Sequence, residues 1–483
     1  MKKICILNRT CRYSNYYKII NSCEGKYEVV RNIRDADWCI FPYCSCSDSN
    51  IEIIEEELKK SLEMKKENCK VIVTGCIFFV KEEKRKFLEK YKIDYLVPME
   101  NQLEEICKIL DVTPSNSVYN HYQIIGEVKI AEGCLNYCAF CRVHYSNRPL
   151  KSVPIEEIID QVEDLISKGI KFLRIVGLNT IQYGLDLYGK KMLPVLLQRI
   201  SKIEGVKGIE VWDCALSDMD DEIANEIYCN DVVIAISMDM QSGSDPLLKR
   251  MNVGFDVKKI RKYFTLLKDK IRYTQIVTGF PGETEEDVKN TVRLLQELQI
   301  FYFKISKYEN SKDTPSGKMQ GLSLSEVMVH NAVYNTMQKL LRANWNMKHN
   351  GEHYVGYVSK LSFESFCVYC PELGEVKVFQ EGQRKLMDKV EVLLENGKCL
   401  FVRVVEESTK KTDFPKESSN QLVDFMTNLK DITTDFTMPI PESFALLTSI
   451  FNEYGGQNLE EEDFRKAISL FPKVLQDALM TLY

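Results

Sequence analysis

The 483-residue sequence has few histidines and tryptophans, five and three respectively, and it contains no long hydrophobic run. Its longest apolar stretch, 71–80, is about half as long as a membrane-spanning helix requires. The apolar run after Lys2 and Lys3 is too short for a signal peptide. From these absences we expect a cytoplasmic protein that does not associate with membranes.

The sequence also lacks an excess of positive charge. It has 64 lysines and arginines against 70 aspartates and glutamates, which gives a net charge of −6. Nucleic-acid-binding proteins usually carry a basic patch or stripe that neutralises phosphates. The overall charge therefore gives no electrostatic reason to expect a nucleic-acid partner.

Cysteine, in contrast, is abundant, with 17 residues, and in a reducing compartment this favours metal ligation over disulfide bonds. Cys134, Cys138 and Cys141 form a CxxxCxxC pattern just after the apolar-alternating run 128–131. Three thiolates can hold three irons of a [4Fe–4S] cluster and leave the fourth iron open. An open iron can chelate the amino and carboxylate groups of S-adenosylmethionine (SAM), so the pattern indicates a SAM-binding cluster.

A zinc site and three unrelated buried thiols are the alternatives for this loop. Zinc sites favour two CxxC pairs or mixed Cys/His spacing, which the loop lacks. We therefore interpret the loop as an iron–sulfur site.

Residues 1–118 alternate short β-type runs with helical patterns. The β-type runs are at 3–7, 37–41, 70–74 and 94–97, and the helical patterns are at 49–66, 81–90 and 102–110. Such alternation predicts an α/β domain with a parallel sheet and crossover helices.

Three further cysteines, Cys11, Cys44 and Cys76, each follow one of these predicted strands. Loops at the carboxyl ends of parallel strands meet at one edge of the sheet, so the three thiols could converge and bind a second cluster. Ordinary core cysteines are the alternative, because free cysteine is often buried. Cys39 and Cys46 compete with Cys44 as the second ligand.

Residues 125–345 repeat the β-then-α pattern more regularly. Strands are predicted at 171–176, 209–214, 232–238, 271–278 and 301–305. Thr284 with Asp287 indicates the capped start of a helix at 285–298. About six such units predict a partial (β/α)6 barrel whose site lies at the carboxyl ends of the strands, where the CxxxCxxC loop also falls.

Other loops on that face carry glycines and polar residues, which allow close backbone approach and offer amide donors to a nucleoside. We expect SAM to contact Phe140, Gly177, Asn179, Gln241, Ser242, Val277 and Gly279. We expect no catalytic side chain beyond the cluster ligands.

The last part of the chain changes character. Residues 349–407 contain short β-type runs that predict a small β-barrel or sandwich module. Residues 408–483 begin with a polar linker and continue with the pattern of two or three amphipathic helices.

Several of these motifs resemble those of the radical SAM methylthiotransferase family. The matching segments are Thr10-Cys11, Tyr43-Cys44-Ser45, Thr74-Gly75-Cys76, Gly133 to Cys141, Val176 to Asn179, Tyr183 to Asp186, Gln241 to Asp245, Leu248 to Asn252 and Gly279 to Thr284. The resemblance covers residues 1–345. It implies an N-terminal domain with an auxiliary [4Fe–4S] cluster on Cys11, Cys44 and Cys76, a radical SAM barrel, and a TRAM-like module at 349–407.

The resemblance also implies the chemistry of two clusters. At the barrel cluster SAM is reductively cleaved, and the resulting 5′-deoxyadenosyl radical abstracts hydrogen from an unactivated C–H bond. The auxiliary cluster carries a sulfur that receives a methyl group from a second SAM, and the substrate radical captures the methylthio group. An electron donor such as flavodoxin or ferredoxin is implied, and we expect a monomer.

Two departures from the family pattern concern the barrel. Relatives usually have His-x-Pro-x-Gln where this chain has Ser237-Met238-Asp239-Met240-Gln241. Relatives also place an arginine near the segment that is Glu210 to Asp213 here. Another residue, such as Arg174, is therefore a candidate to contact the SAM carboxylate.

A third departure concerns the substrate. The acidic residues of the predicted β-module match or outnumber its lysines and arginines; they include Glu364, Glu372, Glu375, Glu381, Glu391 and Glu395. Because RNA binding takes several Lys/Arg contacts to phosphates, this composition favours a protein or a ribosomally made peptide as substrate. Modification of an anticodon-loop adenosine in tRNA is the alternative, supported by local basic residues such as Arg142, Arg148 and Lys151.

Two other functions stay open. The chain could be a radical SAM enzyme of another type, whose auxiliary cluster moves electrons or anchors substrate instead of donating sulfur. It could also be a relative that only binds, although the complete CxxxCxxC pattern argues against this.

Overall fold

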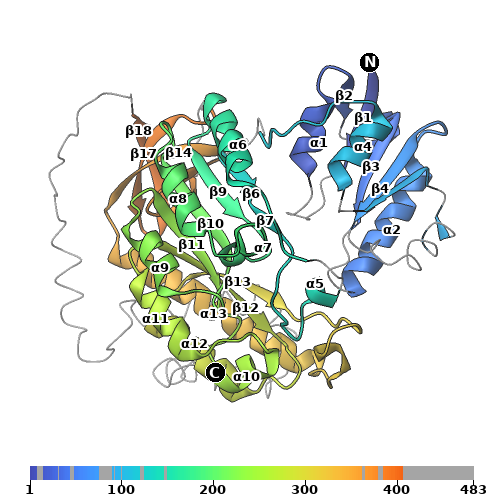
Figure 1. Cartoon of the computed structure of the whole chain (residues 1–483). Helices are drawn as coiled ribbons and strands as arrows, with labels where there is room; N and C mark the ends of the chain where they lie inside the picture. The colour runs from blue at the N-terminus through green and yellow to red at the C-terminus, as the bar shows by residue number, and fades with distance from the viewer. Residues whose placement is uncertain are drawn as a thin grey trace, which may run out of the picture.

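The computed structural model describes residues 1–7, 15–30, 32–43, 48–75, 87, 90–91, 93–98, 101–119, 124–145, 149–361, 365–378 and 385–405. They form three β-containing units, which Figure 1 shows in blue, in green to yellow, and in orange. This arrangement confirms the predicted α/β class with parallel sheets and a small β-module. Cys11, Cys44, Cys76 and the predicted C-terminal helices lie outside the described residues.

The N-terminal unit is a five-stranded parallel sheet in the order β2-β1-β3-β4-β5. Its elements are β1 (Lys2–Ile6), α1 (Tyr16–Cys23), β2 (Tyr27–Val30), η1 (Ile33–Asp35), β3 (Trp38–Tyr43), α2 (Asp48–Met64), β4 (Lys70–Gly75), β5 (Tyr95–Pro98) and α4 (Gln102–Leu110). Helix α2 packs on one face of the sheet, and α1 and α4 pack on the other. The four predicted strands are confirmed, whereas β2 and α1 are additional.

The central unit is a six-stranded parallel sheet in the order β13-β12-β11-β10-β9-β6, the open barrel that was predicted. Its strands are β6 (Ile125–Lys129), β9 (Phe172–Val176), β10 (Gly208–Ala215), β11 (Val233–Asp239), β12 (Ile271–Thr278) and β13 (Tyr302–Lys307), with a small hairpin of β7 (Ala131–Glu132) and β8 (Lys151–Ser152). Most valine and isoleucine side chains of these strands are almost fully buried. This is typical of parallel strands that are covered on both faces.

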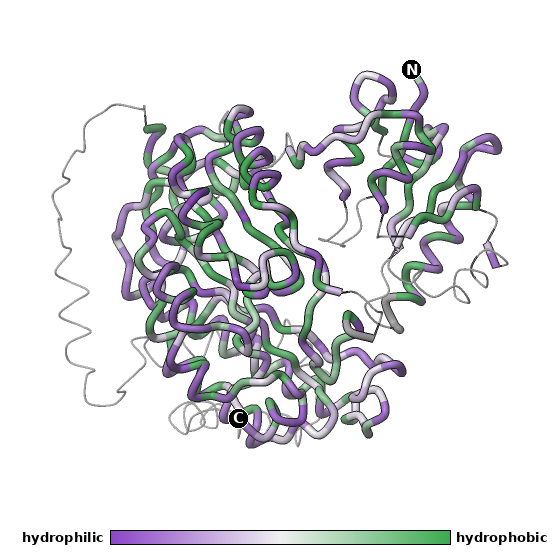
Figure 2. Tube along the Cα trace, in the orientation of Figure 1, coloured by the Kyte–Doolittle hydropathy of each residue, from purple (hydrophilic) through white to green (hydrophobic). Residues whose placement is uncertain are grey.

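Helices alternate with the barrel strands. They are α5 (Arg142–Tyr145), α6 (Ile155–Ser167), η4 (Thr180–Gln182), α7 (Leu185–Tyr188), α8 (Leu193–Ser201), α9 (Asp221–Cys229), α10 (Asp245–Met251), α11 (Val257–Leu266), α12 (Glu285–Glu297), η5 (Ser316–Lys318) and α13 (Leu324–Lys348). Figure 2 shows green hydrophobic strands inside and purple hydrophilic stretches on the outer helices. The capping box predicted from Thr284 and Asp287 opens α12.

The third unit is a closed barrel of five short strands in the order β14-β15-β16-β18-β17. The strands are β14 (His353–Leu361), β15 (Phe366–Cys370), β16 (Gly374–Val378), β17 (Lys389–Glu395) and β18 (Lys398–Val404), close to the predicted runs. Helix α13 leads directly into this module, and its Trp345 packs against the core of the module. The module therefore has a fixed connection to the large barrel.

No helix in the described part of the chain combines the length and the apolar character that a bilayer span needs.

Candidate active site

The CxxxCxxC loop lies directly after β6 and β7, at the carboxyl end of the first barrel strand. Gly133 begins the loop with φ of +74°, and a Cβ atom there would lie 1.9 Å from the backbone oxygen of Pro149. Only glycine is compatible with this turn. Cys134, Cys138 and Cys141 follow it and are partly buried.

The three thiols lie close enough to influence one another. Burial raises the pKa of Cys138 to about 12, and the charges of Cys141 and Cys134 contribute to the same shift. Burial also raises the pKa values of Cys134 and Cys141. Metal ligation deprotonates thiols outright, so a set of three neighbouring thiols in one loop suits thiolate ligation.

This donor set fits three irons of one cluster rather than a single ion. Within the described ranges, no three His, Cys, Asp or Glu side chains surround one ion position. Each cysteine that holds a [4Fe–4S] cluster binds a different iron, so its ligands do not converge on one point. The loop is therefore compatible with the predicted cluster.

A residue in the turn after the second barrel strand, Gln182, holds the start of the loop in place. The backbone N–H of Leu135 donates to Oε1 of Gln182 at 2.9 Å, and Nε2 of Gln182 donates to Oδ1 of Asn136 at 3.0 Å. Gln182 is 1% exposed and lies in η4, just after β9. The sequence did not single out Gln182, because its partners in the loop lie 46 and 47 positions away.

The last part of the loop is fixed by the opposite side of the barrel mouth. The N–H of Ala139 donates to the backbone oxygen of Met251 at 2.8 Å, and the oxygen of Ala139 accepts from the N–H of Ser316 at 3.0 Å. The ring of Phe140 packs edge-on against Phe280, with ring centroids 6.4 Å apart. Phe140 therefore joins the cysteine loop to the segment that follows β12.

The other predicted SAM contacts lie on the same edge of the barrel. Gly177 and Asn179 follow β9, Gln241 and Ser242 follow β11, and Val277 and Gly279 are at the end of β12. The sheet thus brings together the segments that the sequence predicted. Their contact with SAM stays a prediction.

Gln241 has an unusual backbone. Its φ is +60°, and it bridges to β12, where its N–H donates to Gln275 and its oxygen accepts from Val277, both at 2.9 Å. Its side-chain Oε1 is buried and has no hydrogen-bond partner in the described part of the chain. An acceptor left unsatisfied in this way is a candidate contact for a bound ligand.

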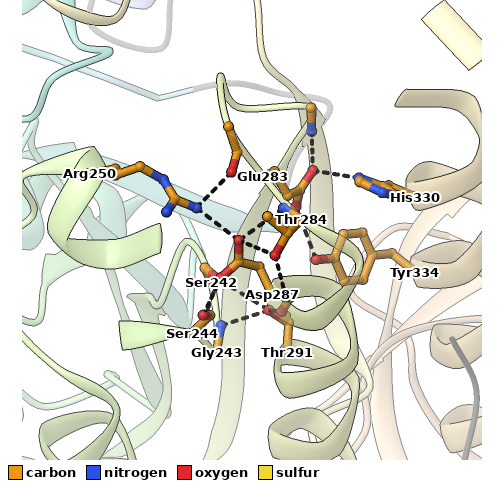
Figure 3. A network of polar contacts seen from close by, with 12 residues as sticks. Ser242, Gly243, Ser244, Arg250, Glu283, Thr284, Asp287, Thr291, His330 and Tyr334 are labelled. Carbon is orange, nitrogen blue, oxygen red and sulfur yellow. Dashed lines mark hydrogen bonds and ion pairs between the residues drawn. The ribbon is translucent and has the colours of Figure 1, made fainter. Parts of the chain in front are cut away.

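Two buried carboxylates link the turns after β11 and β12 (Figure 3). Asp287 accepts from Thr284 at 2.9 Å and from Arg250 at 2.8 Å, and it also accepts from the hydroxyl of Ser244. Burial alone would raise the pKa of Asp287, but the hydrogen bonds from Ser244 and Thr284 lower it below its usual value. The carboxylate is therefore held in its charged form.

Ser242 also belongs to this linkage. Its hydroxyl lies 3.1 Å from Oγ1 of Thr291 on α12, and the N–H of Gly243 donates to the same oxygen at 2.9 Å. A Cβ at Gly243 would lie 2.6 Å from Cα of Thr291, so this close approach requires glycine. The hydroxyl of Ser242 thus contributes to packing of the turn on α12.

Glu283 is the second carboxylate of Figure 3. It accepts from the N–H of Gly279 at 2.7 Å, lies 2.9 Å from Nδ1 of His330, and accepts from the hydroxyl of Tyr334 at 3.2 Å. His330 and Tyr334 lie on α13 and are buried. Glu283 therefore fastens the turn after β12 to α13.

Replacement of Glu283 by alanine is expected to lower the free energy of unfolding by about 3 kcal/mol, because it leaves buried polar groups on Gly279, His330 and Tyr334 without their partner. Anaerobic urea unfolding followed by circular dichroism measures this. Glu286→Ala is the matched control, since Glu286 is exposed and pairs with Arg293 only at the surface, and it should change little. Equal stabilities of Glu283→Ala and wild type would contradict the assigned role.

The side chain of Arg174 is already paired within the protein. Its Nε lies 2.6 Å from Oε2 of the buried Glu210, and its guanidinium stacks over Trp212 at 4.4 Å. The hydroxyl of Tyr369 from the β-module donates to Oε1 of Glu210 at 2.7 Å. In this structure Arg174 joins the barrel to the module instead of offering an unpaired charge to a carboxylate.

A cavity of about 1040 Å³ lies between the inner barrel wall and α13. Its aromatic lining includes Trp212, Tyr273 and Tyr302. Its charged lining has three basic residues, Lys304, Lys339 and Arg342, and three acidic ones, Asp213, Asp239 and Glu375. The guanidinium of Arg342 lies over Tyr302, 4.9 Å from the ring centroid. The cavity is large enough for the side chain of a macromolecule and part of its neighbouring chain.

Comparison with known proteins gives a family match and close relatives. The Radical SAM superfamily model matches residues 128–295, which include the cysteine loop and most of the barrel. The chain is 30% identical over 327 residues to the ribosomal protein uS12 methylthiotransferase RimO of Clostridium botulinum (strain Eklund 17B / Type B), covering 63% of this chain and 73% of that protein. It is 32% identical over 354 residues to the RimO of Thermosipho africanus (strain TCF52B), covering 70% and 81% respectively.

Among solved structures, the chain is similar to the radical SAM methyltransferase TsrM from Kitasatospora setae. The TM-score is 0.49 with 13% identity, covering 74% of this chain and 78% of that chain. A likeness at this level supports no statement about activity.

Proposed function

The chain belongs to the radical SAM methylthiotransferase family, and from this premise we propose that it inserts a methylthio group at an unactivated C–H bond of a protein or peptide residue. It is an enzyme of this family, which uses SAM and [4Fe–4S] clusters. The observation that carries the choice of substrate is the similarity to relatives that are methylthiotransferases of the ribosomal protein uS12.

We assign the SAM-binding cluster to Cys134, Cys138 and Cys141. When bound there, the cluster supplies the electron for reductive cleavage of SAM. The chain's own residues position it: Gln182 fixes the start of the loop, and Met251 and Ser316 fix its end. We assign the auxiliary cluster to Cys11, Cys44 and Cys76.

We assign SAM binding to the segments that share the barrel mouth with this loop. Phe140 and Phe280 form an apolar wall, and Gln241 offers a buried acceptor. Gly279 is held by Glu283, so its backbone position is fixed before a ligand binds. Such preorganisation lowers the cost of binding.

We assign the substrate residue to the cavity of about 1040 Å³. Its wall of aromatic side chains can cover an apolar surface and exclude water from a reactive carbon. Lys304 and Arg342 on the side of β13 and α13 can bind an acidic or carbonyl group of the substrate.

The charge of the β-module supports a protein substrate less strongly than its composition suggests. Glu391 is paired with His353 at 2.8 Å and with Arg403 at 2.5 Å, and Glu375 is paired with Lys360 at 2.5 Å. Arg403 and Lys360 therefore offset the charges of the buried Glu391 and of Glu375. The proposal of a protein substrate therefore rests mainly on the relatives.

The substrate class can be tested directly with the anaerobically reconstituted enzyme. We expect purified uS12 or intact small ribosomal subunits to gain the mass of one methylthio group in place of hydrogen, and total tRNA to gain none. Mass spectrometry of the digested protein and of the tRNA nucleosides measures both. The uS12 sample and the tRNA sample are treated with the same enzyme preparation, so each serves as the control for the other.

A methylthio nucleoside in the tRNA fraction, with no modified peptide, would contradict the proposed substrate. Binding of tRNA that weakens steeply as the salt concentration rises would also favour a tRNA substrate, because each phosphate contact releases counterions. A modified protein other than uS12 would keep the substrate class and replace the substrate.

A further inference from the structure

One carboxylate next to the cysteine loop collects hydrogen bonds from three separate segments. Asp218 lies in the turn between β10 and α9. Its Oδ2 accepts from Nδ2 of Asn179 at 2.7 Å, Nδ2 of Asn136 at 2.9 Å, Oγ of Ser217 at 3.0 Å and Nε2 of Gln182 at 3.1 Å. Four donors on a single oxygen fix its position tightly.

The donors tie Asp218 to the cysteines. Asn136 is part of the CxxxCxxC loop itself, and its N–H donates to the Sγ of Cys134 at 3.4 Å. Asn179 donates to the same oxygen of Asp218 from the turn after β9. Through Asn136, the carboxylate is linked to a predicted iron ligand by one intervening residue.

Asp218 thus places a carboxylate charge beside the loop that carries the three cysteines. A fixed negative charge disfavours any added electron nearby, so it holds an adjacent cluster at a lower reduction potential. Net charge and hydrogen bonds around the sulfurs are among the features that set cluster potentials.

The turn that carries Asp218 has supports of its own. Lys259 donates to the backbone oxygen of Ser217 at 2.8 Å, and Lys191 donates to the backbone oxygen of Asp218. The turn then enters α9, whose first N–H groups are capped by Asp220. A change in the Asp218 side chain can therefore leave the backbone of the turn in place.

We propose that Asp218 is a positioning residue for the SAM-binding cluster: it anchors the cysteine loop through Asn136, Asn179 and Gln182, and its charge keeps the reduction potential of the cluster low. The inference rests on the assignment of Cys134, Cys138 and Cys141 as iron ligands. A low potential is needed because the cluster must reduce SAM.

The test is the Asp218→Asn variant of the full-length reconstituted enzyme, which keeps the size of the side chain and removes its charge. To isolate the SAM-binding cluster, the variant is also made in a background that lacks Cys11, Cys44 and Cys76. A potentiometric titration followed by electron paramagnetic resonance is expected to show a more positive midpoint potential. Reductive cleavage of SAM is expected to slow by about tenfold, the range seen when residues that support metal ligands are replaced.

Two further variants separate charge from anchoring. Asp220→Asn removes a carboxylate two positions away that is already paired with Lys191 at 2.7 Å, and it keeps the helix cap, since asparagine also caps helices. Its potential should shift less than that of Asp218→Asn. Asn136→Ala cuts one tie between the loop and Asp218 and leaves the charge. It is expected to lower the iron content while the remaining cluster keeps the wild-type potential.

The outcomes separate the role of Asp218 from the assignment of Cys134, Cys138 and Cys141 as iron ligands. If the protein that lacks Cys11, Cys44 and Cys76 but keeps Asp218 holds no cluster, the ligand assignment fails. If that protein holds the cluster and its Asp218→Asn variant matches it in iron content, potential and SAM cleavage, the role of Asp218 is overturned. Loss of iron in Asp218→Asn, with wild-type circular dichroism and full iron in Asp220→Asn, supports the anchoring role.

Discussion

In the variant Cys134→Ala/Cys138→Ala/Cys141→Ala, iron is expected to fall from about eight to about four atoms per chain, because one of two [4Fe–4S] clusters loses its ligands. Formation of 5′-deoxyadenosine is expected to stop, since no other described group can take over the reduction of SAM. Iron and sulfide counts with Mössbauer spectra measure the first effect, and chromatography of the reaction products measures the second.

The control for this variant is Cys229→Ala. Cys229 lies exposed at the end of α9, away from the barrel mouth, and its removal should leave iron content and SAM cleavage unchanged. Continued formation of 5′-deoxyadenosine by the triple variant would contradict the assignment of the loop.

The second large effect is expected for Cys11→Ala/Cys44→Ala/Cys76→Ala. Iron should again fall by about four atoms, but the barrel cluster should still cleave SAM. The methylthio product should be lost, because the sulfur source has been removed while the radical is still formed. Mass spectrometry of the substrate, together with counts of 5′-deoxyadenosine and S-adenosylhomocysteine, separates these steps.

Cys46→Ala is the informative comparison for this variant, since Cys46 competed with Cys44 as the second ligand. The other competitor, Cys39, is fully buried within β3 beside Cys5 and does not lie at the end of the strand. Loss of iron in Cys46→Ala, with full iron in Cys44→Ala, would exchange the two residues. An unchanged yield of methylthio product from the triple variant would contradict the auxiliary cluster, and would favour a radical SAM enzyme of another type.

Much of the architecture follows from local patterns in the sequence. Strand β12 and helix α4 lie where the alternation and periodicity predict them, at 271–278 and 102–110. Glycine at 133 and the three cysteines that follow define the loop by spacing alone. Ser323 and Glu326 form the capping box that opens helix α13, a signal that is also local in the sequence.

The residues that hold the cysteine loop in place could not be predicted in the same way. Asp218, Gln182 and Asn136 meet from three segments, and no local periodicity relates residues that are 36 to 82 positions apart. His330 gave no functional signal in the sequence either, yet it is buried against Glu283, 47 positions earlier. Such contacts depend on the closure of the sheet, which only the folded chain provides.

The central claim is that this chain uses a radical made from SAM to attach a methylthio group to a protein substrate. The most direct test is an anaerobic reaction of the reconstituted enzyme with uS12 and SAM that carries a deuterated methyl group. The account predicts that each modified protein carries the deuterated methyl on a new sulfur, with one 5′-deoxyadenosine and one S-adenosylhomocysteine formed per product. Formation of 5′-deoxyadenosine with a product that contains neither the added sulfur nor the labelled methyl would contradict it.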